Sequence, residues 1–238
     1  MLNKDKRSLI LSMVLGDGCL HYIKNAGSVY GGLSIDHGTS QADYVAWKAQ
    51  IVSSITGRNV KVRQGHKGKS VQFQVCWKRL RAWRKFTYPN GKKEIIKILP
   101  FLKHPEFAAA VWLMDDGYVE TSGFQMIHGV KTTKSARFRI FTYSESISDH
   151  DVLIKWFETQ LGVKPKVRFM NDKRTSKTYP FLAFTEKDSL KIWHTIRDTV
   201  LGLKSMQHKF RYIEQVYQFR ILQRAAGNKP DDIVRHSK

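Results

Sequence analysis

The chain has 238 residues, enough for one large domain or two small ones with a sizeable core. Its 41 Lys and Arg residues outnumber the 20 Asp and Glu residues, and the formal net charge is +21. Such an excess indicates a polyanionic partner, with nucleic acid the first choice and an anionic membrane surface the second. The longest apolar runs have seven or eight residues, which argues against a membrane role because a span needs about 20.

The first predicted element is a helix. Residues 1–18, MLNKDKRSLILSMVLGDG, have the basic start and apolar run of a signal peptide, but they end in Gly-Asp-Gly instead of a small-residue cleavage site. The two cysteines, Cys19 and Cys76, lack histidine partners at the fixed spacings of a zinc site. We therefore expect two reduced thiols in an intracellular protein.

One pattern occurs twice along the chain. ILSMVLGDGCL (10–20) and AAVWLMDDGYV (109–119) both join an apolar, helix-like run to an acid, a glycine and a strand, which places Asp17 and Asp116 99 positions apart. Further pairs of segments align in the same order: LSIDHGTS (33–40) with FRIFTYSE (138–145), ITGRNVKVR (55–63) with QLGVKPKVR (160–168), and LRAWRKF (80–86) with LKIWHTI (190–196).

These pairs predict two copies of the order helix, strand, strand, helix, strand, strand, helix. The connection between the copies contains a Pro-Asn-Gly turn signal at residues 89–91. We expect a first repeat over residues 1–87, a linker over 88–106, a second repeat over 107–223 and a mobile tail over 224–238.

Alternating side chains divide each predicted strand into two faces. Apolar residues alternate with glutamines in VQFQV (71–75), with arginines in RFRI (137–140), and with basic residues in KVR (61–63) and KPKVRF (164–169). The polar faces contain almost no acids, which favours a nucleic-acid surface fitted to the major groove over ordinary solvated polarity. The residues expected to contact DNA are Lys61, Arg63, Gln72, Gln74, Arg137, Arg139, Lys164, Lys166 and Arg168.

Both apolar runs end in acids, where the helix dipole is already negative and a carboxylate is destabilising. Two repeats imply an approximate twofold axis, and two motif helices packed side by side on that axis would bring Asp17 and Asp116 together. A divalent cation would stabilise such a pair, and Mg²⁺ prefers oxygen ligands. The small residues that would let the helices approach closely are Ser12, Gly16, Ala109 and Ala110.

LSMVLGDG and VWLMDDG resemble the two motifs of a single-chain LAGLIDADG homing endonuclease, and the resemblance covers roughly residues 8–222. It implies an α+β fold in which two pseudo-symmetric αββαββα repeats form a saddle of antiparallel sheets around a central pair of helices. It also implies a monomeric endonuclease that breaks both strands of duplex DNA at a long asymmetric site. In that family the last acid of each motif binds the metal, Mg²⁺ or Mn²⁺, which here implies Asp17 and Asp116.

Some members of the family place a lysine near each scissile phosphate. NGKKEI matches the first of these segments and implies Lys93, with Lys92 as its rival, and KSMQHKF matches the second and implies Lys209. Next to the last acid, Asp115 of the second motif stands where the first motif has the small residue Gly16.

Two alternatives keep the fold but lose the cleavage. The first is a maturase that folds its host intron RNA, and the second is a DNA-binding regulator. Both acids are present here, which favours cleavage. A third possibility is an anionic-surface binder without chemistry. The sequence contains no visible address, so the host compartment stays open between a bacterial or archaeal cytoplasm and an organelle.

Overall fold

The computed structural model describes residues 3–25, 28–127, 130–142, 146, 148–172 and 176–225. The first half contains, in chain order, α1 (Lys4–Leu15), β1 (Cys19–Asn25), β2 (Ser28–Gly38), α2 (Ala42–Thr56), β3 (Arg63–Gly65), β4 (Ser70–Trp77) and α3 (Leu80–Thr87). The second half contains α4 (Pro105–Asp116), β5 (Gly117–Ile127), β6 (Val130–Phe141), α5 (Asp149–Leu161), β7 (Lys166–Asp172), β8 (Lys177–Ala183), α6 (Glu186–Leu201) and α7 (Lys204–Ala225).

Each half forms one antiparallel sheet of four strands. The strand orders are β1-β2-β4-β3 and β5-β6-β8-β7, so the two sheets have the same topology. Helices α2 and α3 pack on the first sheet, and α6 and α7 pack on the second. The predicted α+β fold with two αββαββα repeats is therefore confirmed, and α7 is an additional helix that extends the second repeat.

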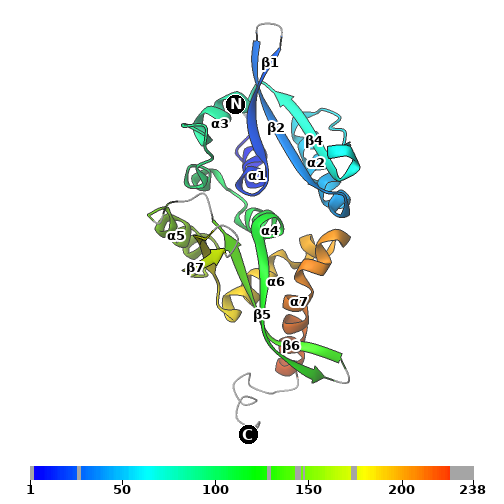
Figure 1. The fold of residues 1–238 in the computed structure, drawn as a ribbon, viewed down its shortest axis with the longest axis vertical. Coiled ribbons are helices and arrows are strands. Elements are labelled where there is room, and N and C mark those ends of the chain that lie inside the picture. Colours follow the sequence, from blue (N-terminus) through cyan, green and yellow to red (C-terminus); the bar gives the residue numbers. More distant parts are fainter. Residues whose placement is uncertain are drawn as a thin grey trace.

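The two halves meet at α1 and α4, which lie side by side in the middle of the molecule (Figure 1). From Ser8 to Leu15 in α1 and from Ala108 to Met114 in α4 nearly every residue is buried, because each helix is covered by its neighbour and by its own half. Trp112 of α4, for example, is fully buried and stacks on Phe157 of α5 with ring centroids 5.8 Å apart. This packing holds the C-terminal ends of both helices at the centre of the protein.

The segment between the halves is part of the core. Two short 3-10 turns, Ile95–Lys97 and Leu99–Phe101, follow α3, and the side chains of Ile95, Ile98 and Leu102 are buried. The proposed domain limits stay a prediction, and the expected tail after Ala225 lies outside the described residues. None of the described helices is long and apolar enough to span a membrane.

The alternation predicted for the strands holds in the centre of each sheet and fails at two edges. Phe73, Phe138 and Ile140 are buried as expected. Val62 is 37% exposed, because β3 begins only at Arg63 and the two preceding residues have no partner strand. Phe169 is 54% exposed, because it pairs with Pro180, where β8 no longer pairs with β6. The prediction of a half-buried strand was wrong at both places.

Candidate active site

The motif acids lie where α1 and α4 end. Asp17 follows the C-cap residue Gly16 of α1, and Asp116 is the last residue of α4. A glycine comes next in each half because the chain folds back onto its own helix. A Cβ on Gly18 would lie 2.4 Å from the Met13 carbonyl oxygen, and one on Gly117 would lie 2.6 Å from that of Leu113.

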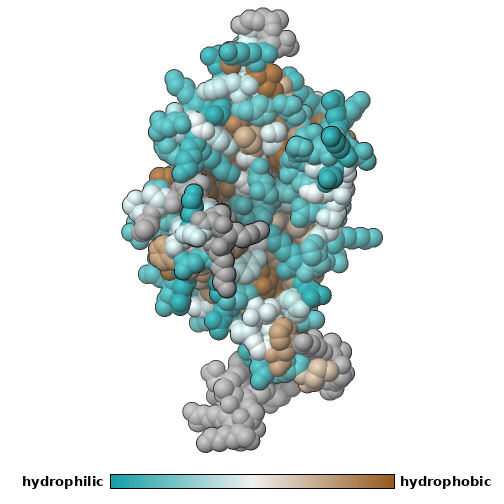
Figure 2. All heavy atoms as spheres, viewed as in Figure 1, coloured by the Kyte–Doolittle hydropathy of each residue, from teal (hydrophilic) through white to brown (hydrophobic). Residues whose placement is uncertain are grey.

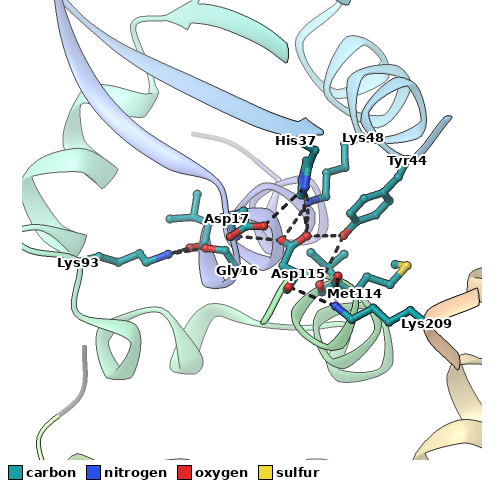
Figure 3. A network of polar contacts seen from close by, with 11 residues as sticks. Gly16, Asp17, His37, Tyr44, Lys48, Lys93, Met114, Asp115 and Lys209 are labelled. Atoms are coloured by element: carbon teal, nitrogen blue, oxygen red, sulfur yellow. Dashed lines mark hydrogen bonds and ion pairs between the residues drawn. The ribbon is translucent and has the colours of Figure 1, made fainter. Parts of the chain in front are cut away.

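A lysine reaches the end of each motif helix from opposite sides (Figure 3). The Nζ of Lys93 donates hydrogen bonds to the carbonyl oxygens of Val14, at 3.0 Å, and Gly16. The Nζ of Lys209 donates to the carbonyl oxygens of Met114, at 2.6 Å, and Asp115, at 3.3 Å. Cations therefore compensate the negative ends of both helix dipoles, which explains how acids are tolerated there.

The carboxylate of Asp116 lies in an unfavourable environment. Burial, followed by the charges of Asp17 and Asp115, raises its pKa to about 7. None of the described residues forms a hydrogen bond or an ion pair with this carboxylate. The pKa of Asp17 is also raised, by burial and by the charge of Asp115, although its side chain is 42% exposed. The centre thus contains two carboxylates without a balancing ion pair.

Asp115 is held differently from its neighbour. Its fully buried carboxylate accepts hydrogen bonds from the Tyr44 hydroxyl at 2.8 Å, from Lys48 Nζ at 2.7 and 2.9 Å, and from the Asp17 backbone N–H at 2.9 Å. Burial alone would raise the pKa of Asp115, but the charge of Lys48, with the hydrogen bonds from Lys48 and from the Asp17 N–H, brings it below its usual value. Asp115 is therefore an ion-paired carboxylate.

His37 joins this network to Asp17. Its Nε2 lies 3.3 Å from Lys48 Nζ, and its Nδ1 lies 3.6 Å from an oxygen of the Asp17 carboxylate. Burial, with the charge of Lys48, lowers the pKa of His37, so the ring is neutral. An ammonium group can only donate, which makes Nε2 the acceptor and leaves the proton on Nδ1, the nitrogen nearer to Asp17.

The sequence prediction did not include Tyr44, Lys48 or His37. A signal was present in ADYVAWKAQIV, where Lys48 occupies the apolar stripe formed by Val45, Ala49 and Val52 of α2. A lysine in such a stripe is buried only with a partner. The partner lies 67 positions along the chain, in the other half, so the sequence spacing could not reveal it.

The oxygen ligands of Asp17 and Asp116 fit a hard divalent cation. Ligand atoms of Asp17, His37 and Asp115 also lie within 4.8 Å of one another, which would suit a metal ion by distance alone. The ammonium of Lys48 is already 2.7 Å from Asp115, however, so it supplies the positive charge there. The pair of last motif acids is the better candidate for the metal ligands.

The predicted DNA contacts are almost all exposed. Arg139 is the exception: its guanidinium pairs with both carboxylate oxygens of Glu120 and lies 4.7 Å from the centroid of the Phe181 ring. Hydrophilic side chains cover most of the face shown in Figure 2, with scattered apolar patches between them. The exposed candidates are Lys61, Arg63, Gln72, Gln74, Arg137, Lys164, Lys166 and Arg168.

The fold resembles solved structures of homing endonucleases. I-WcaI bound to its DNA recognition sequence is 18% identical, with a TM-score of 0.62 over 88% of this chain and 87% of that chain. I-DmoI in complex with DNA and Mn is 16% identical, with a TM-score of 0.50 over 81% of this chain and 96% of that chain. A second I-DmoI complex, with DNA and Ca, is 16% identical with a TM-score of 0.51 over 81% and 89% of the two chains. At these identities the similarities establish the fold.

A comparison with curated proteins found no match. The sequence pattern of the LAGLIDADG DNA endonuclease family matches residues 7–192, which is most of the chain and includes both motifs with their acids. Together with the paired helix ends and their acids, this match shows that the chain is a DNA endonuclease and belongs to the LAGLIDADG DNA endonuclease family.

Proposed function

We propose that this chain is a site-specific homing endonuclease that makes Mg²⁺-dependent double-strand breaks at a long asymmetric DNA site. The observation that carries the proposal is the arrangement at the helix ends, where each half supplies one acid and a lysine reaches the end of each motif helix, Lys93 from the connecting segment and Lys209 from α7. The resemblance to I-WcaI, solved on its DNA recognition sequence, and to I-DmoI, solved with DNA and Mn or Ca, supports it.

Asp17 and Asp116 would hold the divalent cation. When bound, such an ion supplies positive charge that favours attack of water on the phosphodiester and departure of the 3′ oxygen, which gives 5′-phosphate ends. The raised pKa of Asp116 fits this role, because a nearby cation would stabilise the charged form that burial and Asp17 destabilise.

Lys93 and Lys209 have a positioning and electrostatic role. An ammonium group has three N–H donors, and each lysine uses two of them on helix-end carbonyls. One N–H on each lysine therefore remains for a phosphate oxygen or a water. The carbonyl contacts fix both ammonium groups, so little reorganisation is needed when charge develops on the phosphate.

The sheets provide the binding surface in this proposal. Exposed arginines and glutamines on the strands would read base edges in the major groove, and exposed lysines would contact phosphates. Gln72 and Arg63 are directly opposite each other in the β3–β4 register, which places two such side chains in one cross-strand pair.

Asp17→Asn and Asp116→Asn test the metal site. We expect each substitution to abolish cleavage of a target-containing plasmid in Mg²⁺ while DNA affinity stays nearly unchanged, because an amide keeps the shape but loses the charge. Asp198→Asn, at an almost fully exposed position of α6, is the matched control and should cut normally. Cleavage by both motif variants at the rate of the control would refute the assignment.

In this proposal the endonuclease is intron-encoded. The alternative is a maturase that acts on its host intron RNA. Holding two carboxylates with raised pKa values at one centre costs stability, and a protein that only folds RNA gains nothing from that cost. We therefore favour cleavage. A splicing assay on the host intron beside the plasmid assay distinguishes the two, since a pure maturase would splice without cutting.

A further inference from the structure

The two halves of the centre are chemically different. In the first half, Lys48 and His37 face the other half's Asp115. The helix C-caps Gly57 and Gly162 align α2 with α5, and this alignment places Leu153 at the position of Lys48. The same offset of 105 places Thr142 at the position of His37. Among the residues that the structure describes, the second half therefore has no buried lysine or arginine at the corresponding place.

This asymmetry coincides with the difference between the motifs at the position before the last acid, where the first has Gly16 and the second has Asp115. A Cβ on Gly16 would lie 2.1 Å from an oxygen of Asp115, so the side chain of Asp115 occupies the space that Gly16 leaves. From there the carboxylate accepts the backbone N–H of Asp17. No equivalent contact can form in the other direction, because Gly16 has no side chain to reach Asp116.

We propose that Lys48 is a positioning residue that acts through Asp115 on Asp17, so that cleavage of one DNA strand depends on this network and cleavage of the other does not. The inference rests on the proposed endonuclease function. Lys48 fixes both oxygens of Asp115, Tyr44 restrains one of them, and the other orients the peptide that carries the Asp17 carboxylate. His37 provides a second link between the two residues, because its Nε2 contacts the Lys48 ammonium and its Nδ1 lies near the Asp17 carboxylate.

The chain offers a matched pair of variants. Lys48→Met removes the ammonium group and leaves an unbranched side chain of similar length. Leu153→Met makes the same residue at the equivalent buried place in the half without the network. Each variant is compared with the wild type at saturating enzyme and Mg²⁺, on the site selected for cutting from a randomised DNA library, with the two strands labelled separately.

We expect Lys48→Met to change the ratio of the two single-turnover strand rate constants by about tenfold or more, because small displacements of a reacting group have effects of this size. Nicked product should accumulate. Leu153→Met should keep the wild-type ratio. General destabilisation cannot mimic this result, because unfolding lowers both rate constants by the same factor.

Lys48→Met leaves Asp115 without its partner and can fail to fold, so a second variant is needed. In Asp115→Gly/Lys48→Met both charges are removed, and the second motif has glycine as the first motif does. This double variant should fold and should also show the altered ratio, because the Asp17 N–H has lost its acceptor.

The two proposals fail in different ways. A strand ratio within about twofold of the wild type in a folded variant would overturn the role of Lys48 while leaving the nuclease in place. Absence of Mg²⁺-dependent cutting by the wild type on every library sequence would instead refute the endonuclease function at this site, and with it the inference.

Discussion

Asp115 and Asp116 are adjacent in the chain, yet their pKa values move in opposite directions. Both carboxylates are largely buried, and burial raises the pKa of each. Lys48 more than offsets this effect for Asp115, whereas Asp116 has only the more distant charges of Lys93 and Lys209. Asp115 is therefore an anion with a structural role. The charged form of Asp116 is destabilised, and a bound cation would stabilise it.

This difference predicts the pH dependence of the metal-free protein. Because the pKa of Asp116 rises from 3.8 to about 7 on folding, the unfolded state loses this proton first as pH increases. The free energy of unfolding should therefore fall between about pH 4 and pH 7, by at most about 4 kcal/mol from this group. Urea titrations in EDTA at pH 5 and pH 8 measure the change.

Asp116→Asn is the control for this titration. The pKa of His37 is lowered, and a lowered histidine pKa makes stability rise with pH in the same range, so only the difference between wild type and variant isolates Asp116. The wild type should lose more stability than Asp116→Asn on going from pH 5 to pH 8, and Mg²⁺ should remove the difference. Parallel curves in EDTA would contradict the prediction.

At the scale of the elements, two ion pairs join α7 to α6, Arg220 with Glu186 and Glu214 with Arg197, and the second has the larger network. Glu214 of α7 accepts hydrogen bonds from Trp193 Nε1 at 2.7 Å and from the Arg197 guanidinium at 2.6 to 3.1 Å, both on α6. Burial tends to raise the pKa of Glu214, but the bonds from Arg197 bring it below 4.5. Since α7 also carries Lys209, this contact supports the position of a site residue.

Glu214→Gln should therefore destabilise the fold by about 1 to 2 kcal/mol at pH 7, because charge-assisted hydrogen bonds are replaced by neutral ones. The loss should disappear as pH falls through the folded pKa, where the wild-type acid is protonated as well. Glu158→Gln is the control, because its pair with Lys164, at 3.4 Å, is exposed and should contribute little. Equal losses in the two variants, measured by denaturant unfolding, would argue against this role for Glu214.

The helices and strands could be predicted from the sequence where the two halves repeat the same pattern. The motif helices and most strands follow from alternation and from the two aligned copies. The family resemblance singled out Lys93 and Lys209 as phosphate-side lysines, but their contacts with the helix-end carbonyls are visible only in the structure. Contacts between the halves were not predictable, because the Lys48–Asp115 pair depends on how α1 and α4 dock. Strand register was also invisible, so the pairing of Glu120 with Arg139 could not be foreseen.

At the scale of the whole molecule, the net charge of +21 dominates encounters with DNA. Affinity should fall steeply as salt increases, with a slope of about −0.9 per phosphate neutralised on a plot of log affinity against log salt. Arg137 is exposed on β6, whereas Arg139, two residues on, is held by Glu120 and Phe181. The two arginines contribute equally to the net charge, but their environments differ.

Arg137→Ala should weaken DNA binding, either lowering the salt slope if it contacts phosphate or relaxing preference at one base pair by about 1 to 3 kcal/mol if it reads a base. Arg139→Ala should act mainly on stability, because it removes an internal ion pair and the packing on Phe181. Affinities from salt titrations and unfolding curves of both variants check this. The reverse pattern would show that Arg139 leaves Glu120 to read the DNA.

The fit of Asp115 into the space beside Gly16 means that neither half of this chain could be paired with a duplicate of itself. Two copies of the second half would force two aspartates into one volume, and two copies of the first would leave a void between glycines, with two buried lysines that have lost Asp115 as their partner. A gene fusion that joined like halves into a symmetric enzyme would have to rewrite these positions first. The difference between the halves is thus maintained by the absence of a Cβ at Gly16, which leaves room for Asp115.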